Sequence, residues 1–457
     1  MKKIISRAVT AALVATLAAC TATSNNSSSD TSAPGPSALK DANGVTNITI
    51  WDGLGAANGV AFNKLISEFN TANSGKIHVI ATYQGAYADL LAKYTAGLRS
   101  NSSPTILLAG DIATGYLTDV KRSIPAAAMA KANPDDLNLS DLSAAGRNYY
   151  SVNGQEQAVP MNMSTPVLWV NRDLLKTAGI PDTTDLSTLK DVAAAATTVT
   201  QKTGQKGITQ ADDDWYIEQL TAAAGQNFCT PDNGRKDKAA TGITINSGAA
   251  KAAITTLADL YHSGVGLDGA PDGSTALTAF QAGKVAFMFN SSGAAGALKN
   301  GTPFKYEAMP YPLSGPKNTS GTVIGGSALW LSSSATKPEQ VAGWKLETFL
   351  TSSSAQEEFS HATGYVPVNN KVASSATQQA YLASHPNFQV FSNQIRNVPI
   401  ESQTAGCVTG AMTAIRTADI SQIQAAFSGS KPVETALDQA VSDAKSAISQ
   451  YQQQLGH

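Results

Sequence analysis

The residues that could carry enzymatic chemistry are scattered along this sequence and form no recognisable pattern. The sequence contains no G-x-S-x-G elbow, no GxxxxGK[ST] loop, no HExxH motif and no S-x-x-K pair with suitable partners. The histidines have no metal-like spacing to one another; they are His78, His262, His361, His385 and His457. The sequence therefore predicts a protein that is not an enzyme and that holds no cofactor or metal ion.

A set of small polar and aromatic residues lies at or near the junctions between expected elements. These residues offer hydroxyl groups, an indole ring, a backbone N–H, a carboxylate and a guanidinium group, all of which can hold a ligand. The set comprises Tyr87, Asp111, Ser164, Trp215, Ser291, Gly326, Tyr365 and Arg416. Each also has an ordinary structural explanation, such as packing for an aromatic ring or a solvated helix position for Arg416. Their value as a site depends on whether the fold brings them together.

Residues 160–171 illustrate how one of these side chains would be positioned. The polar run 162–165 stops at Pro166, which favours extended backbone at Thr165. The β-rich run 167–170 that follows is typical of a buried strand. Ser164 is therefore expected on a loop that leads into a core strand, and an ordinary turn before a strand is the alternative.

The elements that must position these residues alternate at first between strands and helices. Strands are expected over 48–51, 77–82 and 105–109, with helices around 62–69 and 87–99. This order indicates a largely parallel sheet covered on both faces, where ligands bind beyond the carboxyl ends of the strands. The loops there are 52–59, 83–87 and 110–116.

The strand–helix order then gives way to helices and reappears late in the chain. After a strand at 167–171 the pattern is mostly helical to about 282, and strands return at 284–289, 306–310 and 327–331. We therefore predict an α/β protein with two lobes, a hinge crossed several times and a ligand cleft between the lobes. The folded domain is expected over 46–457, with lobe 1 at about 46–160 plus 294–350 and lobe 2 at about 161–293 plus 351–457.

The N-terminus has the features of an export signal. Lys2, Lys3 and Arg7 precede an apolar run at 8–19 that is too short to span a bilayer. The run ends in Leu17-Ala18-Ala19-Cys20, which resembles the lipobox of bacterial lipoproteins, where the cysteine is lipidated. We expect a signal peptide at 1–19 and a lipidated Cys20 with a flexible tether at 20–45. A plain secretory signal with a chance cysteine is the alternative.

Composition narrows the class of partner. The formal net charge is −2, so the sequence gives no electrostatic reason to expect nucleic acid. No stretch after the signal is apolar enough to span a membrane, so the protein is expected to be exported, anchored by its lipid and otherwise soluble. Cys229 and Cys407 could pair in an oxidising compartment, but the sequence leaves that bridge open.

Several blocks of the sequence resemble the extracellular solute-binding proteins of ATP-binding-cassette importers, carbohydrate-uptake type. The likeness runs from about Ile48 to Tyr451, and within the family it is strongest to members that bind sn-glycerol 3-phosphate. The blocks are 83–87 (YQGAY), 103–107 (SPTIL), 162–168 (NMSTPVL), 324–330 (IGGSALW), 363–367 (TGYVP) and 414–416 (AIR).

The resemblance implies ligand contacts at the eight junction residues. Asp111 departs from the type, because the family has a glutamate at that position. The resemblance also implies that Arg416 binds phosphate, that Asp111 accepts from glycerol hydroxyls at the other end, and that Trp215 stacks on the carbon skeleton. The shorter arm of Asp111 could favour a somewhat larger ligand.

The expected function is capture of glycerol 3-phosphate or a glycerophosphodiester by cleft closure, with delivery to a membrane permease by a monomer. The nearest alternative is the same role for a neutral sugar or oligosaccharide. Weaker alternatives are an exported hydrolase of such compounds, for which the sequence offers no acid–base pair, and a surface adhesin.

Overall fold

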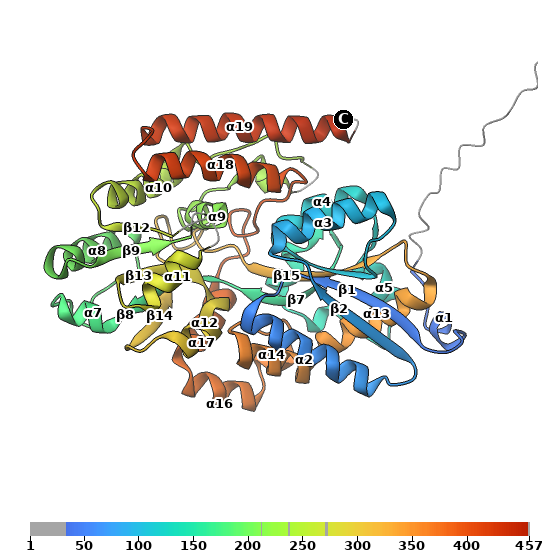
Figure 1. Ribbon diagram of the computed structural model, residues 1–457. Helices are drawn as coiled ribbons and strands as arrows, with labels where there is room; N and C mark the ends of the chain where they lie inside the picture. The colour runs from blue at the N-terminus through green and yellow to red at the C-terminus, as the bar shows by residue number, and fades with distance from the viewer. Residues whose placement is uncertain (1–32, 212, 236–237, 270–272, 456–457) are drawn as a thin grey trace, which may run out of the picture.

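The computed structural model describes residues 33–211, 213–235, 238–269 and 273–455. The expected signal peptide, Cys20 and the first half of the tether, up to residue 32, lie outside these residues. Figure 1 shows two α/β lobes side by side, each built on its own sheet. The expected α/β architecture with two lobes is confirmed.

The first lobe is built on a six-stranded sheet in the order β2-β1-β3-β15-β4, with β7 also paired to β15. Strand β1 (Thr46–Asp52) runs parallel to β2 (Ile77–Tyr83) and β3 (Ile106–Gly110). Strand β15 (Gly325–Ser332) runs antiparallel to β3, β4 (Ser123–Ile124) and β7 (Val159–Ser164). Helices α2 (Ala56–Ala72), α3 (Tyr87–Ser100), α13 (Lys337–Leu350) and α14 (Ser353–Thr363) pack around it.

The second lobe is built on a five-stranded sheet in the order β12-β9-β13-β8-β14. Its strands are β8 (Pro166–Asn171), β9 (Lys206–Gln210), β12 (Gly266–Asp268), β13 (Val285–Ser291) and β14 (Tyr306–Pro310). Its main helices are α8 (Leu189–Thr203), α9 (Asp214–Ala223), α10 (Gly248–His262), α17 (Pro386–Asn397), α18 (Met412–Phe427) and α19 (Val433–Gln454). Helices α18 and α19 lie side by side along one edge of this lobe (Figure 1).

The chain crosses between the lobes at Thr165, between β14 and β15, and between α14 and α17. These crossings correct the predicted lobe boundaries. Residues 161–164 complete β7 in lobe 1, strand β14 belongs to lobe 2, and α14 packs on α2 in lobe 1. These assignments depend on pairing between distant strands and helices, which the local pattern does not contain.

Two further expectations need correction, and one open question is answered. The region 172–282 is not simply helical, since β9 and β12 join the second sheet. The predicted tether extends too far, because α1 (Ser37–Lys40) packs on α13 and Asn133 Nδ2 donates to Pro34 O at 3.0 Å. The disulfide that the sequence left open is formed between Cys229 and Cys407. Among the described residues no helix is both long and apolar enough to cross a bilayer.

Candidate functional site

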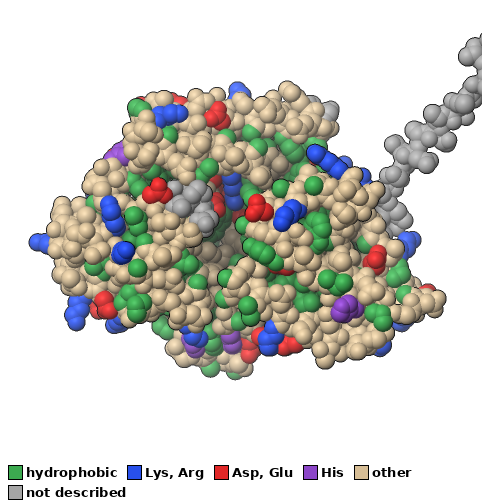
Figure 2. Space-filling model, in the orientation of Figure 1, with side chains coloured by type: hydrophobic (Ala, Val, Ile, Leu, Met, Phe, Trp, Pro, Cys, Tyr) green, Lys and Arg blue, Asp and Glu red, His purple; other side chains and the backbone are tan. Residues whose placement is uncertain are grey.

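The eight junction residues come from both lobes and lie at the edges that face the other lobe. Figure 2 shows a hollow between the lobes with acidic and basic side chains in its wall. Five of the residues belong to lobe 1: Tyr87 begins α3, Asp111 follows β3, Ser164 ends β7, Gly326 lies in β15 and Tyr365 follows α14. The other three belong to lobe 2: Trp215 lies in the first turn of α9, Ser291 ends β13 and Arg416 lies in α18.

Tyr87 is held against the ends of two strands of lobe 1. A Cβ atom on Gly110 would lie 2.7 Å from the Tyr87 ring, and one on Gly53 would lie 2.8 Å from it, so both positions need glycine. The hydroxyl groups of Ser327 and Tyr365 are near enough to influence the pKa of Tyr87, but they lie outside hydrogen-bond geometry. Burial is the main reason that this pKa lies well above its ordinary value. The Tyr87 hydroxyl is therefore neutral and has spare hydrogen-bonding capacity.

Tyr365 and Ser291 both lie close to Gly293, at the boundary between the lobes. A Cβ on Gly293, two residues after Ser291, would lie 3.2 Å from Tyr365 Cζ and 3.4 Å from Ser291 Oγ. Ser291 Oγ accepts from Gly293 N at 3.1 Å, which turns the chain at the end of β13. Burial raises the pKa of Tyr365 to about 12, so its hydroxyl is a neutral donor near this turn.

Ser164 and Trp215 meet over Gly325. A Cβ on Gly325 would lie 2.8 Å from Ser164 Oγ and 2.9 Å from Trp215 Cζ2. Ser164 was expected on a loop, but it is the last residue of the buried strand β7 and is paired with Gly325 in β15. Its position is therefore fixed by a strand pair, which is more rigid than a loop.

Gly326 has a backbone requirement of its own. Its φ is 123°, and a Cβ there would lie 2.2 Å from Asn162 O. Asn162 Oδ1 in turn accepts from Ser327 N at 2.8 Å, so the backbone of β15 at Gly326 is locked against β7. The glycine is needed for this close approach.

Arg416 lies in a buried group of charges. Its side chain is 12% exposed, its Nη2 atom lies 3.1 Å from Glu218 Oε2, and the same atom lies 3.7 Å from Asp111 Oδ2. Burial by itself would lower the pKa of Arg416, but the carboxylates of Asp111 and Glu218 outweigh it and raise that pKa. The guanidinium therefore stays charged and is held between an acid of each lobe.

Three buried acids in this region were not among the predicted site residues. Glu218 and Asp214 lie one turn apart on α9, Asp419 lies on α18, and all three side chains are almost fully buried. Burial raises the pKa of Asp214 to about 8, and it raises the pKa values of Glu218 and Asp419 too. The i, i+4 spacing of two acids on a helix that is otherwise buried was the available signal for Asp214 and Glu218.

Three of the candidate residues carry a buried polar atom that has no partner. Tyr87 Oη, Asp111 Oδ2 and Arg416 Nε are buried and have no hydrogen-bond partner among the described residues. Such atoms are unfavourable unless something satisfies them. Together they offer one hydroxyl, one acceptor and one cationic donor. They can therefore bind a molecule that carries both hydroxyl groups and an anionic group.

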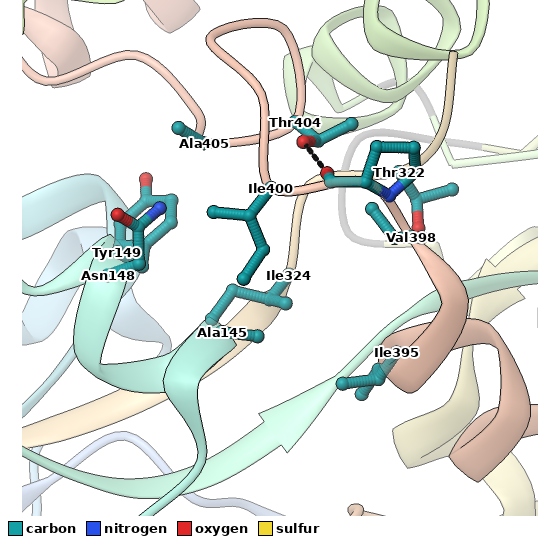
Figure 3. Close-up of a pocket in the computed structure, with 11 residues that line it drawn as sticks. Ala145, Asn148, Tyr149, Thr322, Ile324, Ile395, Val398, Ile400, Thr404 and Ala405 are labelled. Carbon is teal, nitrogen blue, oxygen red and sulfur yellow. Dashed lines mark hydrogen bonds between the residues drawn. The ribbon is translucent and has the colours of Figure 1, made fainter. Parts of the chain in front are cut away.

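Other hollows of the molecule lie away from these residues. Figure 3 shows one beside the hinge, between Tyr149 of α6 (Ala144–Tyr149), Ile395 of α17 and the loop that holds Thr404. It encloses about 20 Å³, room for about one water molecule and far below the size of a ligand site. Two wider hollows, of about 690 and 520 Å³, share Val152, Asn153, Gly234 and Val408. Neither contains a predicted residue, so we place the candidate site by its convergent side chains.

The described acids, histidines and cysteines offer no group of three or more arranged to hold a metal ion. The acids around Arg416 are already balanced in part by its guanidinium group.

Comparison with known proteins gives one family and a consistent set of relatives. Residues 64–388, more than half of the chain, match the family described as bacterial extracellular solute-binding protein. The sn-glycerol-3-phosphate-binding periplasmic protein UgpB of Yersinia enterocolitica is 27% identical over 415 residues, covering 90% of this chain and 94% of that protein. UgpB of Escherichia coli O1:K1 is 26% identical over 409 residues, covering 88% of this chain and 92% of that protein.

Solved structures share the fold. The chain superposes with a TM-score of 0.76 on UgpB from Mycobacterium tuberculosis in complex with glycerophosphocholine, at 17% identity over 89% of this chain and 99% of that one. The acarbose-binding GacH receptor of Streptomyces glaucescens gives a TM-score of 0.75 at 19% identity, over 89% of this chain and 99% of that one. These likenesses confirm the fold expected from the sequence.

Proposed function

Because this chain belongs to the family of bacterial extracellular solute-binding proteins, we propose that it captures sn-glycerol 3-phosphate or a glycerophosphodiester between its lobes for an ATP-binding-cassette importer. The observation that carries the proposal is the trio of unpartnered buried atoms, Tyr87 Oη, Asp111 Oδ2 and Arg416 Nε. A phosphorylated polyol has a complementary group for each of them. The UgpB relatives, which bind glycerol 3-phosphate by name, add support.

The phosphate end would lie at Arg416. Its Nη2 atom is directed to Glu218 and Asp111, while its Nε–H is free to donate a charge-assisted hydrogen bond. The hydroxyl of Ser291, the hydroxyl of Tyr365 and the N–H of Gly326 would add neutral donors. Asp111 would repel a phosphate, so its free Oδ2 would accept from a ligand hydroxyl at the glycerol end. The Trp215 ring, next to Ser164, would cover the carbon skeleton.

Capture would proceed by closure of the two lobes. Asp111 and Tyr87 come from lobe 1 and Arg416 and Ser291 from lobe 2, so a ligand that bridges them binds the closed form better than the open form. The closed form would then deliver the ligand to a membrane permease. The energy for transport would come from a separate ATPase, and this chain would act as a monomer without catalysing a reaction.

Export and attachment complete the proposal. The N-terminal run and Cys20 favour a lipoprotein held on the outer side of the cytoplasmic membrane by acyl chains on that cysteine. Labelling with a radioactive fatty acid, lost in Cys20→Ser, is the expected result. Secretion of an unlabelled wild-type protein would contradict the anchor.

A neutral sugar is the second candidate ligand, and one specific observation favours it. The positive charge of Arg416 is already faced by Asp111 and Glu218, so the cleft has less net attraction for an anion than a free arginine would give.

A thermal-shift comparison separates the two candidates. Glycerol 3-phosphate or glycerophosphocholine at 100 times its Kd should stabilise the wild type by about 2.7 kcal/mol, seen as a raised Tm. Arg416→Ala should show no such shift at the same ligand concentration. A shift with maltose alone, unchanged in Arg416→Ala, would overturn the phosphate assignment and favour the sugar.

A further inference from the structure

The segment 402–408, which joins α17 to α18, is tightly fixed by the loop 229–235. The disulfide links Cys229 to Cys407 at a Cα–Cα distance of 5.5 Å. Asn233 Nδ2 donates to Ser402 O at 2.7 Å, and Val408 N donates to Asn233 O at 2.9 Å. The two segments are therefore joined by the disulfide and by a hydrogen bond on either side of it.

Arg235 fixes the same segment from its other side. The guanidinium group of this half-buried residue donates to Gly406 O at 2.8 Å and also to Ala405 O. It donates to Asn148 O at 3.2 Å and Tyr149 O at 3.3 Å in lobe 1 as well. The peptide group of Cys407 thus has little freedom relative to either lobe.

This fixed peptide group contacts the residue that holds Arg416. Cys407 N donates to Glu218 Oε1 at 2.8 Å, and Glu218 Oε2 accepts from Arg416 Nη2 at 3.1 Å. The Glu218 side chain is 1% exposed, so both of its oxygens are committed inside the protein. A continuous path of bonds therefore runs from the disulfide through Glu218 to the guanidinium group.

We propose that Glu218 is a positioning residue for Arg416, and that the Cys229–Cys407 disulfide holds Glu218 in place through the Cys407 N–H. The consequence for affinity rests on the function proposed above. With the bridge intact, Arg416 presents its unpartnered Nε–H in one orientation, so the ligand does not have to order it. Reduction of the bridge loosens Cys407, Glu218 and then Arg416, and it lowers affinity for the anionic end of the ligand.

A purely structural role for the disulfide makes a different prediction. The bridge closes a loop across a sequence separation of 178 residues, which restricts the unfolded chain. That effect raises global stability but leaves the affinity of the folded protein unchanged. Ligand affinity measured well below the unfolding temperature therefore separates the two roles.

The first test is a double-mutant cycle on ligand affinity, measured by calorimetry with glycerophosphocholine and glycerol 3-phosphate. Cys229→Ala/Cys407→Ala and Glu218→Gln should each weaken binding about tenfold, and the triple variant should weaken it little further, because they act on one path. Leu437→Ala, a core variant of α19 in the same lobe, should lower stability without changing affinity. Additive losses of about 100-fold, or tighter binding by Glu218→Gln, would overturn the proposal.

The second test needs no ligand. The Nε–H proton of Arg416, assigned by its loss in Arg416→Lys, should exchange slowly with solvent in the oxidised wild type. Its exchange should be at least tenfold faster after reduction and in Glu218→Gln. If the wild type binds neither phosphate compound, the proposed function fails, and this exchange rate alone decides the positioning proposal. Equal rates in oxidised and reduced protein would overturn it.

Discussion

Asp111 Oδ2 in lobe 1 and Arg416 Nη2 in lobe 2 face each other at 3.7 Å across the boundary between the lobes. The distance fits an ion pair but exceeds that of an N–H···O hydrogen bond. Asp111 Oδ2 therefore keeps its capacity to accept from a ligand while it attracts Arg416. The pair therefore places an acceptor directly beside a cation, and a ligand that carries a hydroxyl group next to an anionic group offers a partner to each.

The length of the Asp111 side chain should set ligand size. Asp111→Glu adds one methylene group, which moves the carboxylate toward Arg416 and takes space from the ligand. We expect this variant to lose affinity for glycerophosphocholine about tenfold more than for glycerol 3-phosphate, measured by calorimetry. Equal losses of affinity for both compounds would show that the length of the Asp111 side chain does not determine selectivity for ligand size.

Alanine substitutions at the neighbouring residues Gly325 and Gly326 should have different effects. We expect the first to change mainly ligand affinity and the second to change mainly the free energy of unfolding. A methyl group on Gly325 meets the side chains of Ser164 and Trp215, which can shift but would then narrow the site. We expect Gly325→Ala to weaken binding at least tenfold with a loss of stability of about 1 kcal/mol.

Gly326→Ala is the matched comparison for that variant. Its methyl group would meet the backbone oxygen of Asn162 at 2.2 Å, at a φ of 123°. Because a backbone atom can move aside only by distorting the strand pair, we expect the free energy of unfolding, measured in urea, to fall by about 3 kcal/mol or more. Similar stability losses for the two variants would contradict this distinction.

Asp214 should make stability fall as pH rises. Burial raises its pKa from 3.8 in the unfolded chain to about 8 in the folded protein. Between these values the folded protein keeps a proton that the unfolded chain releases, so this contribution to stability is complete below pH 4 and is lost as pH approaches 8. Asp214→Asn removes this pH dependence, and its free energy of unfolding should exceed that of the wild type by about 1–3 kcal/mol at pH 8.

The same comparison at pH 4 supplies the control. Asp214→Asn should match the wild type there, because both side chains are then neutral. Asp438→Asn, at an exposed position on α19, should show no gain at either pH. The measurement is urea unfolding of the three proteins, and an equal gain at both pH values would refute the assignment of a buried, protonated Asp214.

Local pattern in the sequence was enough to predict much of this fold. Strand β14 lies at 306–310 as predicted, because apolar alternation between turn residues is a local signal. The two-lobe architecture followed from the order of strands and helices. Lobe membership did not follow, because the antiparallel pairing of β14 with β8 is set by contacts far apart in sequence.

Strand β7 was missed for a different reason. Pro160 and Asn162 are poor strand residues by type, yet the chain is paired with β15 there, with a register shift next to Pro160. Asn162 Oδ1 accepts from Ser327 N instead of from solvent, which compensates for the burial of this oxygen. Only knowledge of the partner strand reveals this.

Sequence reasoning named the candidate residues but not the side chains that support them, and ligand binding by the eight junction residues stays a prediction. The structure brings the eight junction residues to one interface, whereas Glu218 lies inside a buried helix, where only its i, i+4 spacing to Asp214 marks it. Its role becomes visible only through its contacts with Cys407 and Arg416.

Recognition of phosphate through Arg416 is tested by calorimetric titration of residues 33–457 with glycerol 3-phosphate, glycerophosphocholine and maltose. We predict saturable one-to-one binding of at least one phosphate compound, weakened at least 100-fold (about 2.7 kcal/mol) in Arg416→Ala and unchanged in Arg396→Ala, an exposed arginine on α17. Binding of maltose alone, or phosphate binding that survives Arg416→Ala, would contradict a phosphate site at Arg416.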